Sequence, residues 1–203
     1  LAREVQYYSA GTVEFVVNPN KEFYFLEMNT RLQVEHPVTE ETLGIDIVEQ
    51  MINIANNEKI SITQDNIKTN GWSFESRLCA ESPIKNFLPS AGRLTKLTLP
   101  KEEVRIDYGY KEGNNVSIYY DPMIAKIISK GVDRKTAINS MLTALEKIDV
   151  RGVDTNLNFL MDIYNNQSFI KGEIDTNFID HFYKDGYKGT VKSKLQSFYI
   201  GLL

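Results

Sequence analysis

The sequence predicts an α+β protein, and three patterns support that fold class. Two apolar segments near the N-terminus, separated by the turn residues Asn18-Pro19-Asn20, indicate a β-hairpin. From about Gly71 onward the chain changes to short strands broken by turns. A clear amphipathic helix and two further helical segments follow, so both kinds of element contribute to the predicted core.

Composition narrows the possible classes of protein. The 203 residues are 42% hydrophobic, enough for one large or two small domains. A net charge of -4, a pI near 5.3 and the lack of a basic stripe argue against nucleic-acid binding. The single cysteine, Cys79, allows no internal disulfide and indicates a reducing compartment. The chain shows neither a membrane-length apolar run nor a signal-peptide pattern, so we expect a cytoplasmic protein without a membrane partner.

The first 60 residues predict four local elements. These are a helical stub over 1–9, strands over 12–17 and 23–29, and a helix from Asp46 to about Ala55. The stub has no N-capping residue ahead of it, so we expect the chain to begin inside a domain. Asp46 and Glu49 form a capping-box-like start for the later helix.

The remaining residues predict five strands and three helices. The expected strands are 72–79, 93–99, 104–108, 117–119 and 123–129. Asp133 is the predicted cap of an amphipathic helix whose core face carries Ala137, Ile138, Met141, Leu142 and Leu145 at helical spacing. Two more helices are expected over 155–164 and 176–182.

The hairpin and the residues after it carry a dense set of polar side chains. In an extended segment, residues two apart share a face, which would align Glu27, Asn29, Arg31, Gln33 and Glu35. The turn places Glu14 close to opposite Glu27, and like charges about 5 Å apart on paired strands are destabilising. A divalent cation would remove that penalty, and carboxylates with an amide oxygen are ligands suited to Mg²⁺.

An ordinary solvated sheet face is the alternative interpretation of these charges. The two strands are rich in apolar residues, which instead predicts a buried sheet with a polar rim. Arg31 lies beside the carboxylates, where it is able to clamp an anion, and Glu35 follows at a place where a general base is useful.

The run from Glu27 to Glu40, EMNTRLQVEHPVTE, resembles the signature of the biotin carboxylases, which is one half of an ATP-grasp site. Further segments over 70–83, 87–93 and 119–126 resemble the C-terminal domain of the same family. The similarity extends from about Ala2 to Gly189 and is strongest towards the propionyl-CoA carboxylase α subunits.

The resemblance implies a specific organisation. Residues 1–69 would be the C-terminal part of an ATP-grasp domain, and 70–183 a mixed, mainly antiparallel biotin carboxylase C-terminal domain. Residues 184–203 would begin a linker towards the next domain.

The resemblance also implies a ligase reaction, in which ATP and bicarbonate form carboxyphosphate and biotin is then carboxylated. By position in the signature, the implied site residues are Glu14, Glu27 and Asn29 for Mg²⁺ or Mn²⁺; Glu14, Val16 and Glu27 for ATP; Arg31, Gln33 and Val34 for bicarbonate; Glu35 as general base; and Arg77 for the biotin enolate. Of these, Arg31, Glu35 and Arg77 would be catalytic.

The implied partners are a biotin carrier domain, a carboxyltransferase β subunit and further copies of the enzyme. In a eukaryote the resemblance implies the mitochondrial matrix. The chain contains no Ala-Met-Lys-Met biotin-attachment motif and no glycine-rich ATP-grasp lid. We therefore expect it to lack half of the active site and to be inactive by itself.

Three alternatives remain open from the sequence. In the first, the chain would be a non-catalytic oligomerisation or interaction segment. In the second, it would be a part of an acetyl-CoA, methylcrotonyl-CoA or pyruvate carboxylase. In the third, it would be a part of another ATP-grasp ligase. The segment around Arg77 and the strand after Asp121 argue against the last, because they belong to the domain particular to biotin carboxylases.

Overall fold

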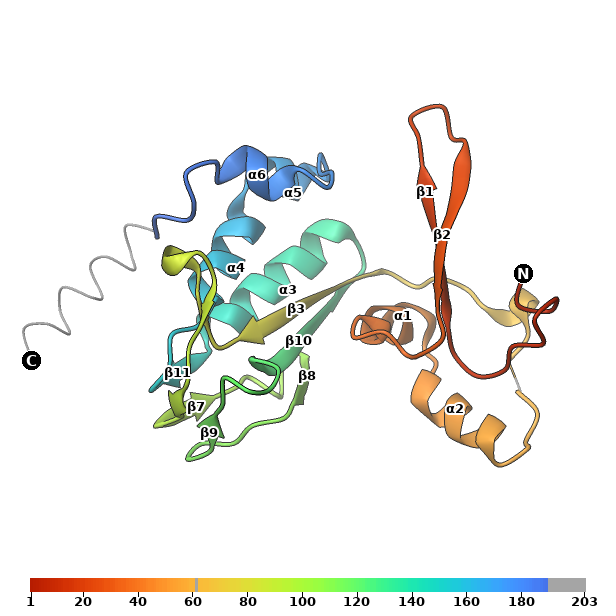
Figure 1. Ribbon diagram of the computed structural model, residues 1–203, viewed down its shortest axis with the longest axis horizontal. Helices are drawn as coiled ribbons and strands as arrows, with labels where there is room; N and C mark the ends of the chain where they lie inside the picture. The colour runs from red at the N-terminus through yellow and green to blue at the C-terminus, as the bar shows by residue number, and fades with distance from the viewer. Residues whose placement is uncertain (61, 190–203) are drawn as a thin grey trace, which may run out of the picture. The chain divides into compact units, whose positions relative to one another are not determined.

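The computed structural model describes residues 1–60 and 62–189, and the chain divides into two compact units. The first is Leu1–Gly71 and the second begins at Trp72 (Figure 1). Among the described residues, no helix has the length and apolar character needed to cross a membrane. The predicted linker over 184–203 lies mostly outside the described residues.

The first unit contains a two-stranded hairpin and two helices. Strands β1 (Thr12–Val17) and β2 (Phe23–Asn29) pair antiparallel, with Glu14 opposite Glu27 as predicted. Helices α1 (His36–Leu43) and α2 (Ile47–Ala55) follow, with the 3₁₀ turn η1 (Gln64–Asn66) after them. The Asp46 side chain accepts the Glu49 N–H at 2.8 Å, which confirms the predicted cap of α2.

Two predictions for the first unit are wrong. The expected helical stub over 1–9 is a series of turns, because Gln6 and Ser9 have φ of 50° and 84°, outside the helical region. Helix α1 was not predicted. It begins with Pro37 in its first turn, where a missing N–H costs nothing, and it ends at Gly44 in a left-handed conformation.

The expectation of a buried hairpin sheet is also wrong. Phe15, Val16, Phe23 and Tyr24 are all exposed within the described residues. In the part of the chain that the structure describes, this sheet contains β1 and β2, and each strand is paired along one edge. Edge-to-face contacts of Phe15 with Phe23 and Phe25 cover part of the apolar surface.

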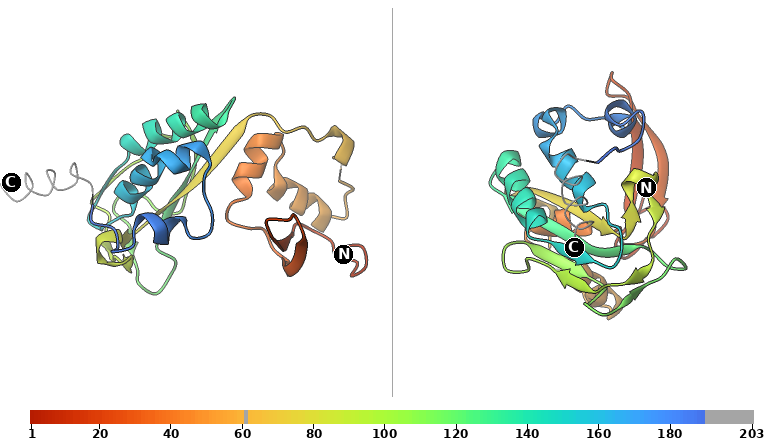
Figure 2. Two further views of the ribbon diagram at one scale, coloured as in Figure 1. Left: turned by 90° about the horizontal axis from the view of Figure 1, so that it is seen from above. Right: turned by 90° about the vertical axis from the view of Figure 1, so that its left-hand side faces the viewer.

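The second unit is built on a three-stranded antiparallel sheet in the order β3-β10-β8. Its strands are β3 (Trp72–Cys79), β10 (Met123–Gly131) and β8 (Arg105–Tyr108). Helix α3 (Arg134–Glu146) packs on β10 and β3, and α4 (Leu157–Asn165) packs on α3 (Figure 2).

The core of the second unit lies between this sheet and α3. Leu78 and Ile127 from the sheet are fully buried together with Met141 and Leu145 from the helix. The predicted core face of α3 is confirmed, and the Asp133 carboxylate accepts the Thr136 N–H at 2.7 Å as the predicted cap.

Short strand pairs and helices complete the second unit. The pairs are β4 (Glu81–Ser82) with β5 (Leu88–Pro89), β6 (Gly92–Arg93) with β9 (Asn115–Val116), and β7 (Lys96–Thr98) with β11 (Asp149–Arg151). The 3₁₀ turn η2 (Pro83–Lys85) and helices α5 (Gln167–Lys171) and α6 (Phe178–Phe182) are the remaining elements.

Two strand predictions need correction. The expected strand over 93–99 is divided into β6 and β7. The Leu94 N–H donates to the Asn114 carbonyl oxygen, whereas the Thr95 N–H donates to the Arg151 carbonyl oxygen, so the hydrogen-bonding partner changes between these two residues. Residues 117–119 form a turn instead of a strand, in which the Ser117 hydroxyl accepts the Tyr119 N–H at 3.1 Å.

Candidate functional site

The hairpin of the first unit brings two carboxylates and two amides together. Asn29 Nδ2 donates to Glu14 Oε1 at 2.7 Å and to Glu27 Oε1 at 3.1 Å. Gln33 Nε2 donates to the same Glu14 oxygen at 2.9 Å. The amide N–H groups therefore offset part of the repulsion between the facing carboxylates.

This donor set fits a hard divalent cation. Within the described residues no three acidic, His or Cys side chains gather into a metal cluster, and a cation held by Glu14 and Glu27 would need further oxygen ligands. Mg²⁺ is commonly bound by one or two carboxylates with substrate phosphates and water. A half-turn of the Asn29 amide would exchange Nδ2 for Oδ1, and Asn29 would then offer a third protein oxygen to a cation.

The segment after β2 bends into α1 and lines a small cavity. Strand geometry ends at Asn29, so the single extended face expected for 27–35 stops there, and Glu35 is the N-cap of α1. The cavity has a volume of about 120 Å³ and is lined by Arg31, Gln33 and Glu35 among others. Since a water occupies about 30 Å³ in the liquid, this space suits a group of a few heavy atoms.

His36 and Glu40 hold this segment in place. His36 Nδ1 lies 2.8 Å from the Gln33 carbonyl oxygen, and its Nε2 lies 3.9 Å from Glu40. Glu40 is buried and accepts the Ile47 N–H at 2.8 Å, which ties α1 to the start of α2. Sequence reasoning missed Glu40, because only the tertiary fold buries this otherwise ordinary helix residue.

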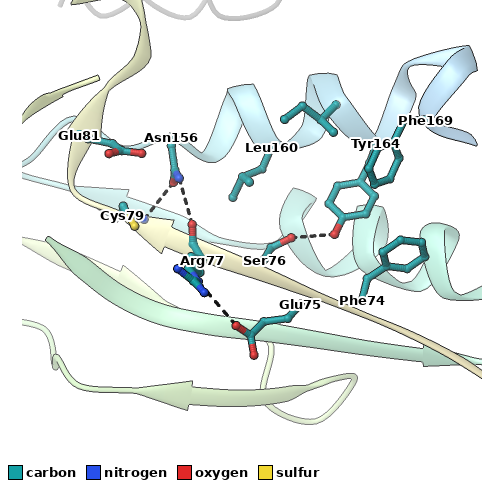
Figure 3. Close-up of a pocket in the computed structure, with 11 residues that line it drawn as sticks. Phe74, Glu75, Ser76, Arg77, Cys79, Glu81, Asn156, Leu160, Tyr164 and Phe169 are labelled. Atoms are coloured by element: carbon teal, nitrogen blue, oxygen red, sulfur yellow. Dashed lines mark hydrogen bonds and ion pairs between the residues drawn. The ribbon is translucent and has the colours of Figure 1, made fainter. Parts of the chain in front are cut away.

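Arg77 lies in β3 of the second unit, with 51% of its side chain exposed. Its Nε is 3.9 Å from Glu75 Oε1 (Figure 3). Its register partner on β10 is Lys126. Arg77 and the hairpin residues thus belong to different units.

Asn156 clamps the backbone of β3 around Arg77. Its Nδ2 donates to the Arg77 carbonyl oxygen at 2.9 Å, and its Oδ1 accepts the Cys79 N–H at 2.9 Å (Figure 3). Asn156 is buried at the N-cap position of α4. Sequence reasoning missed it; an asparagine immediately before a helical segment was the available signal.

A cavity of about 410 Å³ lies beside β3 and is lined mainly by β3, α4 and Phe169 (Figure 3). Here the Ser76 and Tyr164 hydroxyls form a buried hydrogen bond of 2.9 Å. Burial raises the pKa of Tyr164 to about 12 in spite of this bond. Burial, with the nearby Glu81 and Asp121 charges, raises the pKa of the Cys79 thiol to about 11, which disfavours a nucleophilic thiolate.

Comparison with known proteins gives two family matches. Residues 75–181, more than half of the chain, match the family described as "Biotin carboxylase C-terminal domain". Residues 1–63 match "Carbamoyl-phosphate synthase L chain, ATP binding domain".

Curated relatives include propionyl-CoA carboxylase alpha chains. The mitochondrial protein of Homo sapiens is 49% identical over 197 residues, covering 96% of this chain and 27% of the relative. The Ruegeria pomeroyi protein is 47% identical over 210 residues, covering 93% of this chain and 31% of the relative. The chain therefore spans about a quarter to a third of the length of these relatives.

Solved structures show the same fold. The biotin carboxylase domain dimer of Hydrogenobacter thermophilus 2-oxoglutarate carboxylase, in complex with MgADP, ADP and bicarbonate, matches with a TM-score of 0.86 and 39% identity over 89% of this chain and 40% of that one. Kluyveromyces lactis urea carboxylase matches with a TM-score of 0.84 and 43% identity over 88% of this chain and 16% of that one. With the family match over residues 75–181 and α-chain relatives at 47–49% identity, this chain belongs to the biotin carboxylase C-terminal domain family.

Proposed function

We propose that the chain acts as part of the biotin carboxylase of an acyl-CoA carboxylase, with propionyl-CoA as the final acyl acceptor. The observation that carries this proposal is the continuity of two features in one stretch of chain. Glu14 on β1 meets Glu27 and Asn29 at the end of β2, and Arg31 and Glu35, which line the small cavity, follow within six residues of Asn29. Phosphoryl transfer to a small anion needs these two features side by side.

In this proposal Glu14, Glu27 and Asn29 hold Mg²⁺ or Mn²⁺, which when bound offsets the negative charge of the ATP phosphates. Val16, on the same strand as Glu14, contributes an apolar contact to the nucleotide. Arg31, Gln33 and the backbone N–H of Val34 bind bicarbonate, with the guanidinium pairing its oxygens.

Glu35 and Arg77 have separate roles in the chemistry. The Glu35 carboxylate accepts the proton of bicarbonate as a bicarbonate oxygen forms its bond to the γ-phosphorus and ADP leaves. Arg77 stabilises the negative charge that develops on the ureido oxygen of biotin when the N1 proton passes to the phosphate that carboxyphosphate releases, as its carboxyl group bonds to N1. Both roles suit the positions of these side chains, beside a small cavity and on a partly exposed strand.

The proposed partners follow from the same reaction. Biotin would arrive on a carrier domain and leave for a carboxyltransferase subunit, and the complete enzyme would form homo-oligomers. We place it in the cytoplasm, or in the mitochondrial matrix of a eukaryote, as its human relative is described as mitochondrial. The match over residues 75–181 favours this family over other ATP-grasp ligases.

A segment exchange tests the proposal. Residues 1–189 replace the corresponding segment of the Ruegeria pomeroyi α chain, and bicarbonate-dependent ATP cleavage is measured with and without free biotin. We expect an active chimera, and Glu35→Gln to lower its turnover by roughly 10²- to 10⁴-fold, the usual contribution of a general base. Glu41→Gln in α1 is the matched control and should leave turnover unchanged.

Two outcomes would contradict the proposal. One is full activity of the Glu35→Gln chimera, which would remove the assigned base. The other is bicarbonate-dependent ATP cleavage by the 203-residue chain alone, because we propose that it holds one part of the site only. The proposed acceptor needs a separate test, in which the complete enzyme with its own carboxyltransferase subunit is assayed with propionyl-CoA, acetyl-CoA and methylcrotonyl-CoA.

A further inference from the structure

A row of alternating charges crosses one face of the β3-β10-β8 sheet. In spatial order its members are Arg77, Glu75, Lys126, Asp107 and Arg105. They come from three strands, and the register places Arg77, Lys126 and Asp107 directly side by side. The row therefore begins and ends with an arginine, and the two carboxylates lie between the three cations.

The distances show how the row is connected. Glu75 Oε1 is 3.9 Å from Arg77 Nε, and Glu75 Oε2 is 3.9 Å from Lys126 Nζ. Lys126 Nζ is 3.4 Å from Asp107 Oδ2, and Asp107 is paired with Arg105 Nε at 3.1 Å. Contacts of 3.9 Å are too long for hydrogen bonds, so Glu75 acts on its two neighbours mainly through charge.

Burial is greatest at the centre of the row. The side chains of Glu75 and Lys126 are 4% and 11% exposed, against 51% for Arg77. Charges so far from water interact strongly, and removing one partner leaves the other poorly compensated. Burial acts to raise the pKa of the Asp107 carboxyl, but Arg105 and Lys126 outweigh it and lower the pKa below its usual range.

Glu75 thus divides its charge between two cations. One carboxylate oxygen faces Arg77 and the other faces Lys126, while Asp107 attracts Lys126 from the opposite side. Arg77 is the half-exposed end, and Figure 3 shows its guanidinium reaching back towards Glu75. The strength with which Arg77 is held thus depends on how much Lys126 competes for Glu75.

We propose that Glu75 and Lys126 are positioning residues for Arg77, with Glu75 restraining its guanidinium and Lys126 limiting that restraint. The value of this arrangement for catalysis rests on the proposed role of Arg77 at biotin. The restraint itself is a property of the second unit and is measurable without any activity.

Side-chain NMR of the 203-residue chain tests the restraint through the Arg77 Nε–Hε group. Glu75→Gln should lower its order parameter from the rigid range into the flexible one, below about 0.6 on the scale where a rigid backbone gives about 0.85. Lys126→Met should raise the order parameter, because it removes the positive charge that attracts Glu75 Oε2 away from Arg77. If Glu75 and Lys126 only stabilised the fold, the two substitutions would not change the Arg77 order parameter in opposite directions.

A less buried variant and a matched control complete this test. Asp107→Asn removes the carboxylate that attracts Lys126 from the other side, so Lys126 should interact more strongly with Glu75. It should lower the Arg77 order parameter, but less than Glu75→Gln does. This variant replaces Glu75→Gln in the test if Glu75→Gln unfolds. Asp149→Asn is the control, because Asp149 and Arg151 form a 2.9 Å pair with the same two-residue spacing on β11. It should loosen Arg151 and leave Arg77 unchanged. An unchanged Arg77 signal in folded Glu75→Gln and Asp107→Asn variants would refute the proposal.

Kinetics of the chimera described above test the consequence. Glu75→Gln should lower kcat for carboxylation of free biotin by about 10-fold, since misplacement of a charged group reduces preorganisation. The rate of biotin-independent ATP cleavage and the KM for ATP should stay unchanged. If Glu75→Gln loosens Arg77 but Arg77→Ala keeps full activity, the proposed role of Arg77 fails while the restraint stands. If Arg77→Ala is inactive but Glu75→Gln leaves Arg77 rigid, the positioning inference alone fails.

Discussion

Asn29 donates its side-chain amide to Glu14 across the hairpin at 2.7 Å, and so holds together two strands whose facing carboxylates repel each other. The same amide nitrogen also donates to Glu27 Oε1 at 3.1 Å, so it bridges the two carboxylates that we propose as metal ligands. The amide donors offset only part of the repulsion between the Glu14 and Glu27 carboxylates. Neutralising one of these carboxylates therefore tests whether the cluster binds a metal ion.

Glu14→Gln should weaken Mn²⁺ binding to the chain by at least 10-fold, because it removes one of the two carboxylates that we propose as ligands. The same change should leave the metal-free stability unchanged or raise it by up to about 1 kcal/mol, since it relieves the repulsion with Glu27. Titration calorimetry and thermal unfolding measure the two effects. Glu58→Gln, an exposed acid in the same unit, is the control; equal Mn²⁺ affinity of both variants would refute the metal assignment.

Ser76→Ala should destabilise the second unit by about 1–3 kcal/mol, because the buried Tyr164 hydroxyl loses its 2.9 Å partner. The double variant Ser76→Ala/Tyr164→Phe should recover part of that loss, since both polar groups are then removed. Denaturant unfolding of the two single variants and the double variant gives the coupling energy. Strictly additive effects would show that the hydroxyl pair contributes nothing.

Alkylation of Cys79 should be slow at pH 8 and should approach half of its maximal rate only near pH 11. Burial raises this pKa from its ordinary value of 9.0 to about 11, so the thiolate fraction at pH 8 is roughly 100-fold lower than for an unshifted thiol. Because the folded-state pKa is raised, the protonated thiol contributes stability below about pH 9, and this contribution is lost as the pH rises towards 11. Iodoacetamide kinetics against pH provide the measurement, and a midpoint near pH 9 would contradict it.

Gly152→Ala should destabilise the second unit by about 2 kcal/mol or more. Gly152 has a φ of 102°, and an added Cβ would overlap the Arg93 carbonyl oxygen where β6 passes beside the end of β11. Gly186→Ala is the matched control, because Gly186 has a φ of 74° and no atom of the described residues lies within 4 Å of its Cβ position. It should cost about 1–2 kcal/mol, from backbone strain alone. Equal losses in thermal unfolding would show that close approach is not the cause.

Local patterns in the sequence predicted the hairpin correctly. The strand bounds and the opposition of Glu14 and Glu27 follow from side-chain alternation around a short turn. The cap at Asp133 and the buried face with Met141 likewise follow from helical spacing. Each depends on residues within about one turn or one hairpin of each other, which is why the sequence sufficed.

Other features depend on contacts between distant segments. The exposure of Phe15 and Val16 was not predictable, because apolar alternation does not show whether anything covers a strand. Helix α1 was not predicted because Pro37 lies at its start, and a proline is compatible with a turn as well as with the first turn of a helix. The break between β6 and β7 lies where the backbone hydrogen bonds change from Asn114 to Arg151, two residues that are distant from each other in the sequence.

Neighbouring residues encode the family signature from Glu27 to Glu40, the hairpin register and the amphipathic helix, so these features could be read from the sequence. The side chains that surround Arg77 are known only from the folded structure. Asn156 clamps its backbone from 79 residues away, and Lys126 reaches its register position on another strand. Sheet register and burial bring such groups together, and neither leaves a periodic trace in the local sequence.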